Sequence, residues 1–155
     1  MDGTDADIIE LLQLDARRGQ QDIASRVHLS QPAVAERIKK IEERGLIRGY
    51  VARVDPTKLG QDVTAFVGVG ISHPKYFDGF AKRVAALPEI LEAHRVAGRE
   101  SYLLKIRTTN TRTLDDILIR VLRTIPGVTR TETTVVLASI KEETFVPVLR
   151  KEEAP

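Results

Sequence analysis

QQDIASRVHLSQPAVAERIKKIEERGLIRG, residues 20–49, has the spacing of two short helices separated by a turn. The first helix is expected over residues 20–27. Ser30 stands where its hydroxyl can cap the second helix, and Pro32 falls in the first turn of that helix, where its missing N–H leaves no bond unmade. Gly45 is placed to end the second helix in a left-handed conformation. The stretch therefore predicts a helix-turn-helix.

Each expected helix carries one apolar stripe for a shared core. The stripes consist of Ile23, Ala24 and Val27 in the first helix and Val34, Ile38 and Ile41 in the second. The opposite side of the second helix is slim and cationic, with Ala33, Glu36, Arg37 and Lys40. After it, IRGYVARV (residues 47–54) alternates and contains Gly49, which predicts a small β-wing.

The cationic side of the second helix suits double-stranded DNA. A major groove about 12 Å wide admits one helix, whose first turns can then read base edges. Gln31 can pair with adenine, while basic side chains reach phosphates or guanine. The candidate DNA-contacting residues are Ser30, Gln31, Ala33, Arg37, Lys39, Lys40, Arg44 and Arg48. Alternating charges also occur on plain solvated faces, and winged helices sometimes bind protein, but the combined signals favour DNA.

The stretch DIASRVHLSQPAVAERIKKIEERGLIRGY, residues 22–50, resembles the signature of the Lrp/AsnC family of bacterial and archaeal transcription factors, and it aligns without gaps. One departure is His28, at a turn position where the family usually has glycine. A positive φ is uncommon for other residues, but His is among the enriched types, so the turn is expected to form with some strain.

Composition agrees with an intracellular DNA-binding protein. The 155 residues are 42% hydrophobic, contain no cysteine and carry a formal net charge of +2. Residues 1–15 hold five acids and no base, whereas residues 16–53 hold nine bases and four acids, so positive charge is concentrated on the expected DNA-binding module. No signal peptide or membrane-spanning apolar run is present in the sequence. We expect a cytoplasmic, nucleoid-associated protein.

Flanking segments complete the expected domain plan. Thr4 followed by Asp7 resembles a capping box before a helix that presents Ile8, Leu11 and Leu12. Pro and Gly mark residues 54–62 as a linker. The predicted divisions are a winged helix-turn-helix over 1–53, the linker, a second domain over 63–140 and a tail over 141–155. Phe145, Val146 and Val148 are candidates to dock, and the charged end of the tail is expected to fray.

The second domain changes to a period of two. In VTAFVGVGI, residues 63–71, one face is apolar, and the other holds Gly68 and Gly70, which predicts a strand approached closely by another group. The remaining pattern reads βαββαβ, with two similar halves that each end in an Ile/Leu-Pro step. This order predicts a ferredoxin-like sandwich, so the overall class is α+β. Its open sheet face is expected to be covered by a second copy, giving a homodimer.

This second half resembles the effector-binding domain of the same family, which assembles dimers into tetramers or octamers and often binds an amino acid. The resemblance implies an effector loop in VAGRESYLL, residues 96–104. The candidate effector-binding residues are Gly98, Arg99, Glu100, Ser101, Tyr102 and Thr133. A carboxylate can hold an ammonium, and hydroxyls can hold a carboxylate. A glycine turn with flanking charges is also common in proteins that bind nothing there.

Enzymatic function is not expected. His28, His73 and His94 lack the spacing of a metal or nucleophile site, and no phosphate-binding loop is present in the sequence. We therefore expect no metal and no cofactor. The favoured function is a sequence-specific transcriptional regulator of amino-acid metabolism, modulated by an amino acid. Two alternatives remain: a ligand-sensing module that regulates by protein contact, and a nucleoid-organising protein without an effector.

Overall fold

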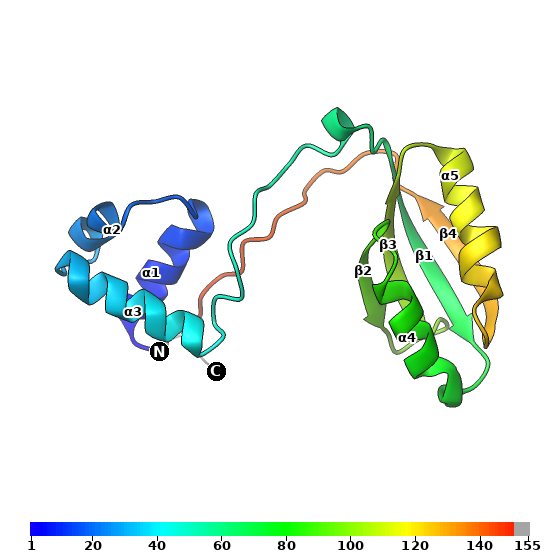
Figure 1. Ribbon diagram of the computed structural model, residues 1–155, viewed down its shortest axis with the longest axis horizontal. Helices are drawn as coiled ribbons and strands as arrows, with labels where there is room; N and C mark the ends of the chain where they lie inside the picture. The colour runs from blue at the N-terminus through cyan, green and yellow to red at the C-terminus, as the bar shows by residue number, and fades with distance from the viewer. Residues whose placement is uncertain (151–155) are drawn as a thin grey trace. The chain divides into compact units, whose positions relative to one another are not determined.

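The computed structural model describes residues 1–150, which divide into two compact units (Figure 1). The first unit contains residues 1–53 and the segment that begins at Lys141; the second spans Val54–Ile140. The tail, which the sequence set apart, therefore belongs to the first unit. The expected fraying concerns residues 151–155, which lie outside the described residues.

The first unit is built from α1 (Gly3–Leu14), α2 (Gln20–Arg26) and α3 (Gln31–Glu43). Their apolar stripes meet in one core of Ile8, Ile9, Leu12, Ile23, Ala24, Val34, Ile38 and Ile41. The predicted helix-turn-helix, with a third helix packed on it, is confirmed.

Local geometry at the helix ends explains these bounds. The Ser30 hydroxyl accepts a hydrogen bond from the Ala33 amide at 3.4 Å and caps α3. His28 has a φ of 54° in the turn, and Gly45 a φ of 69° after α3. The capping box predicted at Thr4 is wrong, because the Asp2 carboxylate caps α1 by accepting from the Asp5 amide at 2.8 Å.

The predicted β-wing is also wrong, since residues 46–54 contain no strand. A strand needs a partner for its backbone N–H and C=O groups, and alternation alone does not supply one. Val51 is 81% exposed, so the alternating side chains bury no common face. Instead, the Tyr50 hydroxyl donates to Glu42 of α3 at 2.8 Å and holds the segment against that helix.

The second unit contains a four-stranded antiparallel sheet in the order β2-β3-β1-β4. The strands are β1 (Val63–Ile71), β2 (Ile90–Arg95), β3 (Tyr102–Thr108) and β4 (Val128–Val135). The helices are α4 (Phe77–Ala85) and α5 (Thr111–Asp116), and α5 continues through a π-helical turn, Ile117–Val121, into a 3-10 turn, Leu122–Thr124. Further 3-10 turns span Thr57–Leu59 in the predicted linker and Pro74–Tyr76 before α4. The predicted ferredoxin-like sandwich is confirmed.

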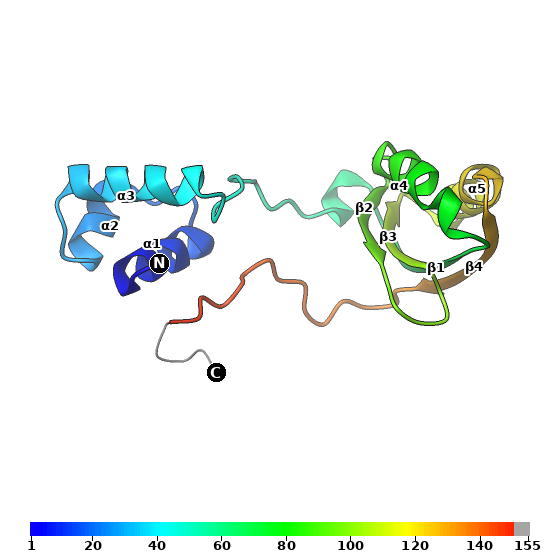
Figure 2. The ribbon, with the colours of Figure 1, turned by 90° about the horizontal axis from the view of Figure 1, so that it is seen from below.

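Both helices lie on one face of this sheet (Figure 2). The core between helices and sheet consists of Ala65, Val67, Val69, Phe80, Val84, Tyr102, Leu104, Ile106, Leu114, Leu122 and Ile125. Leu122 is fully buried, whereas an α-helical period counted from Leu114 would bury Val121; a π-helical turn holds more residues than an α-helical one and shifts the apolar stripe. The opposite face carries Phe66 and Leu103, each more than a third exposed.

Candidate functional site

The first turn of α3 presents a slim, exposed edge. Gln31 and Pro32 are exposed and Ala33 is half-buried, so no bulky side chain projects there. The Ser30 hydroxyl is engaged in capping this turn. Such a turn can approach a base edge closely, and the Gln31 amide can donate and accept hydrogen bonds there.

Arg37, predicted to contact DNA, is engaged inside the unit. Its Nη1 lies 2.7 Å from Asp2 Oδ2 and 2.6 Å from Asp5 Oδ1. The Asp5 side chain is only 12% exposed, and Arg44 Nη1 lies 4.0 Å from its other oxygen. The pKa of Asp2 is lowered, first because its carboxylate accepts from the Asp5 amide and then because it accepts from Arg37. Arg37 thus ties α3 to the start of α1, and its contact with DNA stays a prediction.

The two lysines of α3 are held more loosely. Lys40 pairs with Glu36 at 2.7 Å and Lys39 with Glu43 at 3.7 Å, each one helical turn apart. All four side chains are more than 60% exposed, so each pair is weak and open to exchange with a phosphate. The hydrogen bond from Lys40 lowers the pKa of Glu36. Within residues 1–150, Arg48 is exposed and has no ion pair.

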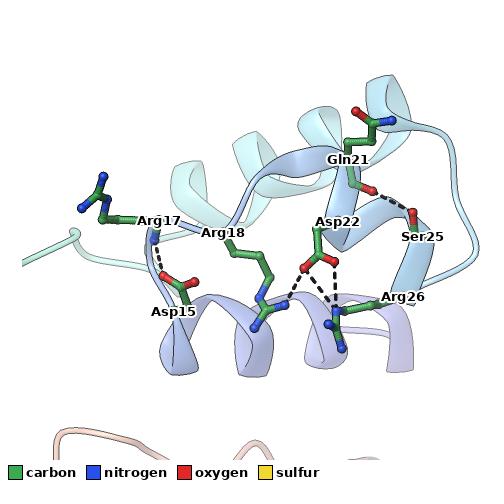
Figure 3. A network of polar contacts seen from close by, with 7 residues as sticks. All are labelled: Asp15, Arg17, Arg18, Gln21, Asp22, Ser25 and Arg26. Carbon is green, nitrogen blue, oxygen red and sulfur yellow. Dashed lines mark hydrogen bonds and ion pairs between the residues drawn. The ribbon is translucent and has the colours of Figure 1, made fainter.

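A polar network missed from the sequence fixes the start of α2 (Figure 3). The Asp22 carboxylate accepts from Arg18 and, at 3.1 Å, from Arg26. The hydrogen bond from Arg18 is the largest cause of the lowered pKa of Asp22. The spacing of residues 18, 22 and 26, two steps of i,i+4, is the signal that could have revealed this network.

In the second unit, the β2–β3 loop turns toward the sheet face that the helices leave open (Figure 2). There Glu100 Oε1 accepts from Arg130 of β4. A Cβ added to Gly68 would lie 2.8 Å from Glu100 Cγ, and one added to Gly70 would lie 3.5 Å from Glu100 Oε2. The Glu100 side chain therefore approaches Gly68 closely, whereas the atom nearest to a Cβ on Gly70 would be Thr129 Oγ1, at 3.3 Å. Glu100 Oε2 is buried and has no hydrogen-bond partner among the described residues.

The predicted effector residues on either side of Glu100 make contacts that hold the β2–β3 loop against the sheet. The Ser101 hydroxyl accepts from the Ile71 amide at 3.1 Å, and the Ser101 amide donates to the Val69 carbonyl at 2.9 Å. Arg99 lies 3.8 Å from Glu132 on β4, and Gly98 is exposed in the turn.

Tyr102 and Thr133 do not join Glu100, so the six predicted effector residues are not one cluster. Side chains alternate between faces along a strand, and Tyr102 therefore points toward the helices. It is 7% exposed, with its ring centroid 4.7 Å from that of Phe80. Thr133 pairs with the buried Val67 and shares its face. Arg130 is the charged residue that the sequence did not reveal.

The described residues, 1–150, contain no group of three or more His, Cys, Asp or Glu side chains placed to hold a metal ion. None of their helices has the length and apolar character needed to cross a bilayer.

Comparison with known proteins places both units in one family. The Lrp/AsnC ligand binding domain matches residues 64–146, and the AsnC-type helix-turn-helix domain matches residues 1–42. The HTH-type transcriptional regulator FL11 of Pyrococcus horikoshii is 35% identical over 96% of this chain and 97% of its own.

Solved structures give the same relationship. A transcriptional regulator from Neisseria meningitidis in complex with L-Met has a TM-score of 0.91 at 29% identity, covering 95% of this chain and 96% of its own. A feast or famine regulatory protein from M. tuberculosis, complexed with L-methionine, has a TM-score of 0.88 at 33% identity, covering 95% and 99%. This chain belongs to the Lrp/AsnC family of helix-turn-helix transcriptional regulators.

Proposed function

We propose that this regulator recognises specific double-stranded DNA with α3 in the major groove and controls genes of amino-acid metabolism. The observation that carries the proposal is the capped first turn of α3, where exposed Gln31 stands beside the small Ala33. In this arrangement Gln31 contacts a base edge, and Lys39, Lys40 and Arg48 contact phosphates on either side. Such a protein acts on the chromosome, so we place it in the cytoplasm, associated with the nucleoid.

When DNA binds, its phosphates would replace the exposed glutamates as the ion-pair partners of Lys39 and Lys40. A half-site that uses about three basic side chains gives a dimer a log–log salt slope near roughly −5, from about −0.9 per phosphate neutralised. Arg37 contributes by holding α3 on α1, because its guanidinium is already shared by two carboxylates.

The assembly that we propose is a homodimer formed through the open sheet face, able to assemble further into tetramers or octamers. Exposed Phe66 and Leu103 on that face support this, since apolar side chains there gain from being covered. One recognition helix reads few base pairs, and two-fold symmetry doubles the number.

The effector that we propose is an amino acid bound at the Glu100–Arg130 pair. A zwitterion has an ammonium that suits Glu100 and a carboxylate that suits Arg130, so it can insert between the two. The free Glu100 Oε2 supports this, because a buried acceptor without a donor gains from a ligand N–H. The L-methionine complexes of the Neisseria and Mycobacterium relatives support an amino acid as the class of ligand.

Titration of the protein's own upstream DNA over a range of salt concentrations, with and without each amino acid, tests the proposal. Lys40→Ala should weaken binding of all sequences and flatten the salt slope by about one per half-site, whereas Gln31→Ala should reduce discrimination between sequences. Lys58→Ala, an exposed lysine in the 3-10 turn Thr57–Leu59, is the control. Salt-independent binding would favour a module acting by protein contact. Salt-dependent DNA binding with no response to any amino acid would favour a nucleoid-organising protein.

Two variants test the effector site separately from the DNA site. Glu100→Gln and Arg130→Gln should both reduce the affinity for the amino acid while preserving DNA binding in its absence. Thr133→Val, on the other face of the sheet, is the matched control. An amino acid that binds Glu100→Gln with unchanged affinity contradicts the site.

A further inference from the structure

The last described part of the tail, from about Val146 to Arg150, lies near α1 in the first unit (Figure 2). The side-chain amide of Gln13 bonds both backbone groups of one tail residue: its Nε2 donates to the Val146 carbonyl at 2.9 Å, and its Oε1 accepts from the Val146 amide at 2.8 Å. Through this pair of bonds Gln13 acts as a neighbouring strand residue would. Val146 itself is 67% exposed, so its backbone, not its side chain, provides the anchor.

Contacts on both sides of Val146 extend the docking. Val148 packs against the core of the first unit, although it lies more than a hundred residues from any helix of that core. Farther along, Arg150 Nη2 lies 2.6 Å from Asp7 Oδ1 and 3.8 Å from Glu10 Oε2 on α1. Toward the other end, Arg53 pairs with Glu143 at 3.0 Å.

The tail sequence favours this bound form. Pro147 lies between the hydrogen-bonded Val146 and the packed Val148. Proline restricts its own φ and keeps the residue before it extended, so less conformational entropy is lost when the segment docks.

We propose that residues 143–150 are a strap that completes the DNA-binding unit. With the strap docked, the DNA-binding unit is connected to the second unit by two segments of chain, one that follows Arg53 and one that begins at Lys141. The chain leaves the first unit after Arg53 and returns to it at Lys141, so docking of the strap adds a second connection between the units. Two connections restrict reorientation of the recognition helix more than one flexible linker does. Release of the strap lowers the stability of the helix-turn-helix and frees its orientation.

Because the natural chain has no cysteine, one introduced thiol reports on the strap directly. Val148→Cys places a thiol of similar size against the core, and its rate of reaction with a thiol reagent measures release. Gln13→Ala, in that background, should raise the rate roughly five- to a hundredfold, because two hydrogen bonds of ordinary strength are lost. Gln13→Glu keeps the acceptor but loses the donor, so its rate should be intermediate.

The thiol-reaction experiment has two controls and is accompanied by one independent measurement. Gln21→Ala, an exposed glutamine of α2, should leave the rate unchanged, and Leu137→Cys, at 98% exposure, gives the rate of a free thiol. In the chain with its natural Val148, the Val146 amide should exchange hydrogen faster after Gln13→Ala. A Val148→Cys rate equal to that of Leu137→Cys, or no effect of Gln13→Ala on either measurement, overturns the proposal. A Val148→Cys rate that falls as protein concentration rises overturns it too, because the tail then docks on another copy.

Discussion

The substitution Arg37→Ala distinguishes between two roles of the Arg37 guanidinium, which are stabilisation of the first unit and direct contact with DNA. The guanidinium bridges Asp2 and Asp5 at 2.7 and 2.6 Å. Removing it leaves the Asp5 carboxylate, 12% exposed, with Arg44 Nη1 at 4.0 Å as its remaining cation. The substitution should therefore destabilise the first unit before any DNA is added.

The magnitude follows from the burial of the pair. Removing one partner of a fully buried ion pair costs about 3–5 kcal/mol, whereas an exposed pair contributes about 0.2–1 kcal/mol. Arg37 is 33% exposed and Asp5 is 12% exposed, so the pair lies between these limits, and we expect a loss of about 1–3 kcal/mol. For a unit of this size that corresponds to a melting temperature lower by roughly 5–20 °C.

Thermal unfolding followed by far-ultraviolet circular dichroism measures the loss of stability. Fluorescence anisotropy, recorded well below the melting temperature, measures DNA affinity. Asp5→Asn should destabilise in the same direction, whereas Lys39→Ala, on an exposed pair, should change the free energy of unfolding by less than about 0.5 kcal/mol. The reasoning is refuted if Arg37→Ala melts like the parent but loses DNA affinity. That result would mean that the guanidinium contacts DNA directly.

Three further predictions concern single side chains. Ser30→Ala should cost about 1 kcal/mol through loss of the α3 cap, and Ser30→Asp should preserve it, as measured by chemical denaturation. Gly68→Ala should destabilise the second unit by about 1–3 kcal/mol, since the new Cβ would lie 2.8 Å from Glu100 Cγ; an unchanged melting temperature would show that Glu100 moves aside freely. Partial desolvation of the Tyr50 hydroxyl and its hydrogen bond to Glu42 raise the pKa of Tyr50 to about 12, so its stabilising contribution should persist below pH about 10 and disappear as pH rises through about 12. Glu42→Gln should lower that pKa in an ultraviolet titration, and an unchanged titration would contradict the hydrogen bond.

Signals that act over a few residues were readable from the sequence. The Ser30 cap and the left-handed Gly45 depend on neighbouring backbone groups, and both are as predicted. His28 has the positive φ that its turn position implied. The small residues Gly68 and Gly70 predicted a close approach, and the Glu100 side chain makes it at Gly68.

Pairings across long sequence separations were not readable. Helical period placed Arg37 away from the apolar stripe of α3, but it could not show that Asp2 and Asp5, more than thirty residues earlier, lie opposite. The DNA assignment treated every outward cation of α3 as available. Burial of a partner acid distinguishes Arg37 from Lys40, and burial depends on how α1 packs on α3.

The effector loop shows how one further physical rule would have improved the prediction. The predicted set was collected from consecutive positions, yet a strand sends alternate residues to opposite faces. Applied to β3, this rule separates Tyr102, in register with the buried Val69, from Leu103, in register with Gly68 on the open face. On β4 it separates Thr133 from Arg130, whose register partner is Gly70. Glycines on one face of a central strand thus indicate where a side chain from a neighbouring loop crosses the sheet, and the strand register then identifies its charged partner.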